Sequence, residues 1–213
     1  MPNLDFTQLL IGFSILLVSL TVHEAAHAWS ADRLGDPTAR RLGRVSLNPA
    51  VHIDLIGTVI FPLIAIVTNL PLIGWAKPVP VSVTALGANW RGKFMAIAAA
   101  GPASNVLLAA IAAIVIRLIG DAGVNDSRSL GDQFGSMLVT TIYVNVLLAV
   151  FNMIPVPPLD GGNVLAGLLR GPVGAAFDRL RPYGFLILYG LMLTGLLTTI
   201  ISPPASLLLT WLL

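Results

Sequence analysis

The sequence predicts an all-α membrane protein, a polytopic helical bundle with about four full transmembrane helices. It also predicts a re-entrant segment near 55–73 and a short extended, β-hairpin-like stretch near 74–84. Hydrophobic residues make up 56% of the 213-residue chain and charged residues only 10%, whereas soluble domains carry about 25% charged residues. The mean hydropathy is +0.87. Long apolar runs leave few residues for a water-facing unit, so we expect one domain over residues 1–213.

The apolar runs define the expected spans. A transmembrane helix needs about 20 consecutive apolar residues. Four runs reach this length: roughly 8–31, 94–119, 135–154 and 183–201. The first lacks the basic region of a cleavable signal before it, so we expect a retained span. After the last, Pro203–Pro204 is expected to separate the helix from a tail too short to cross alone.

Two further segments depart from the pattern of a simple span. Glycine, asparagine and proline interrupt the apolar run 55–73, which is therefore either a broken span or a re-entrant segment. In 74–84, small apolar residues alternate with prolines. Because a proline favours extended backbone in the residue before it, a strand or hairpin edge is expected there.

Composition also limits the partners and the metal ligands. The formal charge of +2 is small, and no basic stripe indicates a nucleic-acid partner. The chain has no cysteine, which excludes disulfides and thiolate zinc sites. Histidine and carboxylate side chains remain as strong metal ligands. The oligomeric state is not fixed by the sequence.

The first apolar run contains His23-Glu24-Ala25-Ala26-His27. Residues four apart on a helix share one face, with Cβ atoms about 5–6 Å apart, so the two imidazoles can bind one ion. Catalytic zinc takes three protein ligands and keeps a fourth position for water, and a glutamate beside the first histidine can act on that water as general base. The motif predicts His23 and His27 as Zn²⁺ ligands and Glu24 as the catalytic base.

Polar residues of this kind can instead pack or hydrogen-bond inside a helix bundle. Ionisable side chains in a span are costly, about 2.5–3.5 kcal/mol each for Asp, Lys or Arg on insertion scales, and usually mark function. The chain has three histidines and a single glutamate, so chance is a poor explanation for this spacing. We therefore favour a catalytic metal site.

A third ligand must come from an aspartate or from His52. Asp160 is the favoured candidate because it follows the 135–154 run within a segment rich in proline and glycine. Prolines fix a turn there, and glycines allow close backbone approach. The alternative is that Asp160 only caps a helix that begins near Asn163.

With both motifs in place, the sequence resembles the site-2 protease family of intramembrane zinc metalloproteases. That family carries an intramembrane H-E-x-x-H and a distant Asn, Pro and Asp-Gly motif that supplies the third ligand. Both occur here in that order, and the likeness extends to Gly101–Asn105 and Leu47–Asp54. Within that family, the sequence resembles the short bacterial branch, which has no PDZ insertion. The resemblance implies hydrolysis of peptide bonds in transmembrane substrate helices, as in regulated intramembrane proteolysis.

The resemblance also implies roles for individual residues. The ligands would be His23, His27 and Asp160, and the base Glu24. Asn152 would bind the substrate backbone or the developing oxyanion, or would instead bond a carbonyl freed near Pro155 and Pro157. Asn105 and His52 lie in family-like segments and are further candidates for substrate binding. Their alternatives are interhelical hydrogen bonding for Asn105 and a loop hydrogen bond for His52.

Topology decides whether the expected ligands can share one ion. If 55–73 crossed fully, three crossings would place His27 and Asp160 towards opposite faces of the membrane. If it dips and returns, both lie on one side, so the metal site requires a re-entrant segment. Lysine and arginine collect on cytoplasmic connections. With a re-entrant segment, the lysines and arginines of residues 33–93 lie on the same side of the membrane as the arginines of residues 170–181. We expect a multi-pass protein of the cell (plasma or inner) membrane with its active site towards the cytoplasm.

Three other functions stay open. A zinc or divalent-metal transporter would also use intramembrane histidine and aspartate, but it has no need of Glu24, and inverted repeats are not visible. A non-catalytic membrane scaffold would not need a full set of ligands and base. A metalloprotease acting on soluble peptides at the membrane surface would differ only in substrate access. The expected partners are a transmembrane protein substrate and the lipid bilayer, with zinc as cofactor.

Overall fold

The computed structural model describes residues 6–68, 74–120 and 130–213. Over these residues the chain is helical and contains no strand. Three helices are long and apolar enough to cross a membrane: α1 (Phe6–Arg33), α5 (Trp90–Gly120) and α6 (Leu130–Asn152). They confirm the first three expected spans and identify a multi-pass membrane protein.

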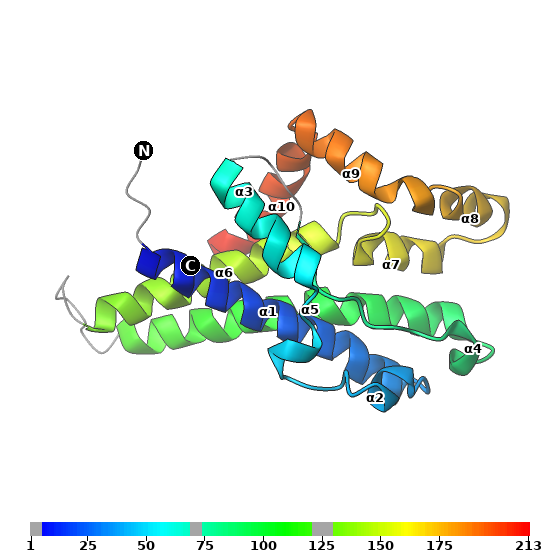
Figure 1. Ribbon diagram of the computed structural model, residues 1–213, viewed down its shortest axis with the longest axis horizontal. Coiled ribbons are helices and arrows are strands. Elements are labelled where there is room, and N and C mark those ends of the chain that lie inside the picture. The colour runs from blue at the N-terminus through cyan, green and yellow to red at the C-terminus, as the bar shows by residue number, and fades with distance from the viewer. Residues whose placement is uncertain (1–5, 69–73, 121–129) are drawn as a thin grey trace.

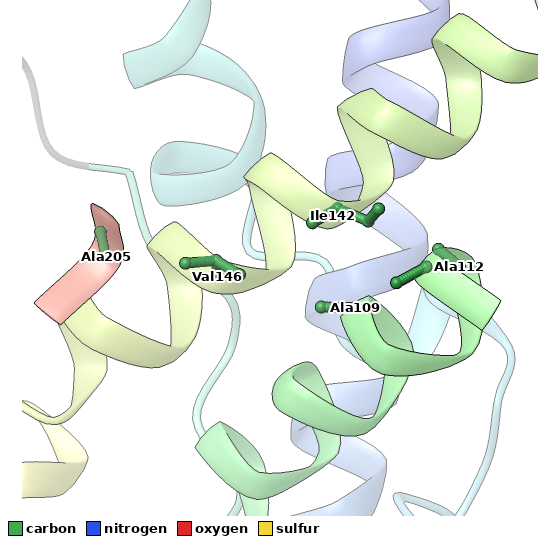
Figure 2. Close-up of a cluster of buried hydrophobic side chains, with 6 residues drawn as sticks. Ala109, Ala112, Ile142, Val146 and Ala205 are labelled. Atoms are coloured by element: carbon green, nitrogen blue, oxygen red, sulfur yellow. The ribbon is translucent and has the colours of Figure 1, made fainter. Parts of the chain in front are cut away.

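Helix α5 runs the length of the molecule, and α1 and α6 pack along it (Figure 1). The packing against α6 depends on small side chains. Figure 2 shows Ala109 and Ala112 of α5 beside Ile142 and Val146 of α6, with Ala205 of α10 (Leu196–Leu212) completing the buried cluster. Small residues let helix backbones approach closely in a membrane, where lipid is as apolar as the side chains and packing must supply the attraction.

The expected span at 183–201 is not one continuous helix. The chain forms α9 (Gly184–Leu193) and then α10, and the helical stretch Gly171–Leu193 is bent by 83° relative to α10. Gly195 lies at the break with φ of 75°, a left-handed conformation that glycine adopts without steric penalty. Counted as one broken span, this pair brings the candidate spans to four.

The expected stop at Pro203–Pro204 is wrong, because α10 continues through both prolines to Leu212. Membrane helices tolerate proline better than soluble ones, since neighbouring helices and Ser or Thr side chains satisfy the freed backbone groups. Pro204 lines the same hollow as Ala103 of α5 and Val150 of α6. Packing against these helices therefore holds the tail in place.

Residues 55–68 form an excursion that leads away from Asp54, and by residue 75 the described chain lies again beside the start of this excursion. It contains η2 (Leu55–Ile60, π-helical) and α3 (Phe61–Thr68), and its first turn is capped by the Asp54 carboxylate. The Trp75 N–H donates to the Gly57 carbonyl at 3.1 Å, and the Thr58 hydroxyl donates to the Trp75 carbonyl at 2.8 Å. The chain at residue 75 is thus back beside residues 57–58. Residues 69–73 of the expected re-entrant segment lie outside the described residues.

The connecting segment 74–82 forms no hairpin, so this part of the expectation is not confirmed. It has no regular secondary structure and leads into a helical turn, α4 (Val83–Leu86). Prolines at 78 and 80 cannot donate ladder hydrogen bonds, and the Lys77 N–H donates to the His52 carbonyl at 2.9 Å. At its end, the Ser82 N–H donates to the Asp36 carboxylate at 2.6 Å.

Short helices complete the fold. They are α2 (Thr38–Arg41), η1 (Pro49–Val51), α7 (Asp160–Leu168), α8 (Gly171–Asp178) and η3 (Arg181–Tyr183). Helix α7 packs against α5 and lies at the same end of it as α4 (Figure 1). Because α1 also packs against α5, the start of α7 lies close to α1.

Candidate metal centre

Two histidines of α1 face α5 in the interior of the bundle. His23 and His27 are 4% and 8% exposed, and their Nε2 atoms lie 3.1 Å apart. One helical turn separates them, as their spacing of four residues requires. The sequence prediction that both imidazoles share one face is confirmed.

The Asp160 carboxylate lies beside both imidazoles, although Asp160 is far from them in the sequence. Its Oδ2 lies 3.1 Å from His23 Nε2 and 3.3 Å from His27 Nε2. It is the first residue of α7, the N-cap is Leu159, and no side chain caps this helix. The alternative that Asp160 serves only as a helix cap therefore does not hold. Gly161 permits the tight bend before α7, because a Cβ there would lie 2.2 Å from the Met153 carbonyl oxygen.

The hydrogen bonds of the imidazoles decide which nitrogens face Asp160 with a lone pair. His27 Nδ1 lies 2.7 Å from the Ile97 carbonyl oxygen, which can only accept, so Nδ1 carries the proton. His23 Nδ1 lies 2.6 Å from Asn105 Oδ1 in the same arrangement. In neutral imidazoles with this arrangement, both Nε2 atoms present lone pairs to a carboxylate oxygen that is buried without a hydrogen-bond donor among the described residues.

Three lone-pair atoms brought together in this way fit a bound cation. Tetrahedral zinc with bonds of about 2.0–2.2 Å holds its ligand atoms about 3.3–3.6 Å apart, close to the 3.1–3.3 Å found here. The donor set, two imidazoles and one carboxylate, is one that catalytic zinc uses. Within the described part of the chain, His23, His27 and Asp160 form the one group of three or more such side chains.

Gly101 of α5 makes room for the two imidazoles, and sequence reasoning gave it no role. A Cβ at this position would lie 2.4 Å from His27 Nε2 and 2.6 Å from His23 Nε2. No side chain larger than hydrogen fits there without moving the histidines. The signal in the sequence was Gly101-Pro102, a pair of poor helix formers inside an otherwise apolar span.

Glu24 follows the first histidine and is 9% exposed. The described residues give its carboxylate no hydrogen bond, and it lies close enough to Arg44 for the two charges to interact. Burial lowers the pKa of the Arg44 guanidinium, and the Glu24 charge acts in the opposite direction. Arg44 is 6% exposed and donates to the Lys77 carbonyl. It therefore links the connecting segment 74–82 to the region of Glu24, a role that sequence reasoning missed.

The three residues that the sequence suggested for substrate binding lie in different parts of the structure. Asn152, at the end of α6, is partly buried and donates to the Leu148 carbonyl at 2.9 Å. Asn105 is completely buried and contacts His23. His52 is 2% exposed, bonds the Ser46 carbonyl at 2.8 Å and lies outside the three-residue group. The structure thus brings Asn105 to the centre but places His52 in a loop hydrogen bond.

Two apolar hollows lie elsewhere in the molecule. One of about 350 Å³ lies between the Val22–Trp29 part of α1 and the Val45–Leu47 loop. Another of about 540 Å³ lies between α5, α6 and α10. None of the three converging side chains lines either hollow. The candidate centre is therefore identified from its converging polar atoms.

Comparison with known proteins adds independent information. The chain is 32% identical over 188 residues to YwhC of Bacillus subtilis, covering 88% of this chain and 82% of the relative, which is named as a candidate zinc metalloprotease. The profile described as "Peptidase family M50" matches residues 118–193. The chain belongs to peptidase family M50. Its resemblance to the site-2 proteases is thereby confirmed.

A second relative is less similar in sequence. Rip2 of Mycolicibacterium smegmatis, also named as a candidate zinc metalloprotease, is 29% identical over 181 residues, which cover 84% of this chain and 64% of Rip2. No solved structure matches this chain significantly. The segment matched by the M50 profile contains Asn152 and Asp160, whereas the histidines of α1 precede it.

Proposed function

We propose that residues 1–213 form one zinc metallopeptidase domain that cleaves transmembrane substrates within the bilayer. His23, His27 and Asp160 would hold the ion, and Glu24 would be the general base. One observation carries the proposal: three lone-pair atoms lie 3.1–3.3 Å from one another in a buried place. Membership of peptidase family M50 and the names of both relatives support the same chemistry.

The proposed chemistry divides between the ion and the protein. When bound, zinc would supply Lewis-acid polarisation of a water and of the scissile carbonyl. Glu24 would accept a proton from the attacking water and transfer it to the leaving amine nitrogen. Its freedom from hydrogen bonds to described residues leaves both carboxylate oxygens available for this transfer. Asn152 keeps its side-chain carbonyl oxygen and one N–H for the backbone of a substrate.

Substrate access and membrane position form the second part of the proposal. We infer that the excursion 55–68 is re-entrant, since residues 57 and 75 are joined by a backbone hydrogen bond of 3.1 Å. Non-helical backbone at membrane depth must be buried in protein or line a water-filled cavity, and hydrolysis needs such a cavity. With the basic connections on the cytoplasmic side, the centre would face the cytoplasm.

The decisive experiment compares wild type with Glu24→Gln after purification in detergent. Both proteins should contain about one zinc per chain, because the ligands are untouched, but only the wild type should cleave an unstable transmembrane peptide. Asp178→Asn, the same carboxylate-to-amide change at an exposed position on α8, serves as control and should remain active. An active Glu24→Gln protein, or a wild type that never binds zinc, would overturn the proposal. Zinc uptake into vesicles without proteolysis would indicate a transporter instead.

A further inference from the structure

Behind His23, a chain of side-chain hydrogen bonds crosses the three long helices. His23 Nδ1 of α1 lies 2.6 Å from Asn105 Oδ1 of α5. Asn105 Nδ2 donates to Asn145 Oδ1 of α6 at 2.8 Å, and Asn145 Nδ2 donates to the Thr141 carbonyl oxygen at 2.9 Å. Both asparagines are 0% exposed. Asn145 is not one of the three side chains of the candidate centre.

The direction of every hydrogen bond in this chain follows from backbone carbonyl groups. The Thr141 carbonyl can only accept, so Asn145 must turn its amide nitrogen towards it and its oxygen towards Asn105. Asn105 must then present its own nitrogen to Asn145 and its oxygen to His23. The proton of His23 is consequently held on Nδ1, which leaves the Nε2 lone pair directed at Asp160.

Two further contacts support the same orientation. Asn145 Nδ2 also donates to the Ser19 hydroxyl at 2.9 Å, and Asn105 Nδ2 lies 3.4 Å from the Ser19 carbonyl oxygen. Reversing either amide would place two acceptors against each other in a dry interior. A buried polar group left unsatisfied costs about 1–3 kcal/mol, so the reversed arrangement is strongly disfavoured.

We propose that Asn145 is a positioning residue that acts through Asn105 to fix the tautomer of His23 that can bind a metal. The inference rests on the proposed function, because the tautomer matters only if Nε2 binds an ion. Without the acceptor at Nδ1, the proton would move to Nε2, where the Asp160 carboxylate lies 3.1 Å away. His27 needs no such support, since a backbone carbonyl holds its Nδ1 directly.

The test uses two variants of equal shape, Asn145→Thr and Asn145→Val. The threonine hydroxyl can donate to the Thr141 carbonyl one turn earlier, as threonine commonly does in helices, and can accept from Asn105. Valine can do neither. Zinc affinity, measured by chelator competition, should fall about 10–100-fold in Asn145→Val, as for other losses of an outer hydrogen-bond partner, and should stay close to wild type in Asn145→Thr.

Histidine ring ¹⁵N spectra of the metal-free proteins supply a readout that does not need a loaded enzyme. The wild type and Asn145→Thr should hold the His23 proton on Nδ1, whereas Asn145→Val should shift it towards Nε2, and His27 should not change in either. Equal zinc affinity and equal His23 spectra in all three proteins would overturn the inference. Equal losses in both variants with lowered melting temperatures would assign Asn145 a packing role and overturn it too. Failure of the proposed function looks different, because the wild type itself would then bind no zinc.

Discussion

Replacing Gly101 with alanine should displace both histidines while leaving the helix intact. The added Cβ would lie 2.4 Å from His27 Nε2 and 2.6 Å from His23 Nε2, whereas ordinary contact begins at 3.4 Å, so the shortfalls are 1.0 Å and 0.8 Å. Zinc bonds tolerate deviations of about 0.2 Å. Two of the three proposed ligands would therefore leave bonding range, and the loss of zinc affinity should exceed the roughly 10–100-fold typical of an outer-shell change.

The assay separates this effect from a loss of folding. Alanine inside a helix is about 0.5–1 kcal/mol more favourable than glycine, which offsets part of the roughly 1–3 kcal/mol that overpacking costs, so metal-free Gly101→Ala should remain folded. Gly12→Ala is the matched control, because the same change in α1 meets nothing within 4 Å and should keep both zinc and cleavage. A Gly101→Ala protein with wild-type zinc affinity would mean that the imidazoles do not converge against α5.

Two further predictions concern the connecting segment and the topology. Burial alone would raise the pKa of Asp36, but the hydrogen bonds that its carboxylate accepts from Thr38 and from the Ser82 N–H outweigh burial and lower this pKa. The stabilisation that these hydrogen bonds give the folded protein is therefore complete above about pH 4, the ordinary pKa of aspartate. It is lost as the pH falls through the lower pKa of Asp36 in the folded protein. Asp36→Asn should therefore reduce stability by about 1–3 kcal/mol at pH 7, with a difference from wild type that shrinks below about pH 4; a pH-independent difference in melting temperature would contradict this. Because the chain has no cysteine, a single cysteine can be introduced at Leu47, Val83 or Leu118 and labelled from either side of the membrane. Cysteines at Leu47 and Val83 should label from the cytoplasmic side, and one at Leu118 from the other side. Labelling of the Leu47 and Val83 positions from opposite sides would exclude a re-entrant excursion.

Apolar length predicted the three long helices because this property is local. Each run of about 20 apolar residues has one low-energy structure in lipid, a helix that satisfies its own backbone. The break in the fourth span has a cause that is equally local but easily overlooked. Gly195 breaks the apolar run at a left-handed turn, while the more conspicuous Pro203–Pro204 stays inside α10. The packing of α10 against its neighbours outweighs the intrinsic preference of proline.

The candidate site was predictable where its parts are close in sequence. The spacing of His23 and His27 fixes their common face, and the Pro- and Gly-rich bend marked Asp160. The residues that hydrogen-bond behind His23 could not be found in this way, because they are distant in sequence: Asn145 is 126 residues from its partner Ser19. Only the packing of α1, α5 and α6 brings such residues together, and a single sequence carries no record of that pairing. A polar side chain within an apolar span is the one available signal, and Asn145 gave it.

The two histidines of the centre differ in how securely their tautomers are held. His27 bonds a backbone carbonyl at 2.7 Å, an acceptor that no side-chain substitution removes. His23 bonds the side chain of Asn105, whose orientation depends on the Asn145 side chain at 2.8 Å and on the more distant Ser19 carbonyl oxygen at 3.4 Å. Substitutions remote from the ion can therefore disturb His23 but not His27. A movement of α6 relative to α5 would act in the same way, so the metal affinity of this centre should depend on the packing of those two helices.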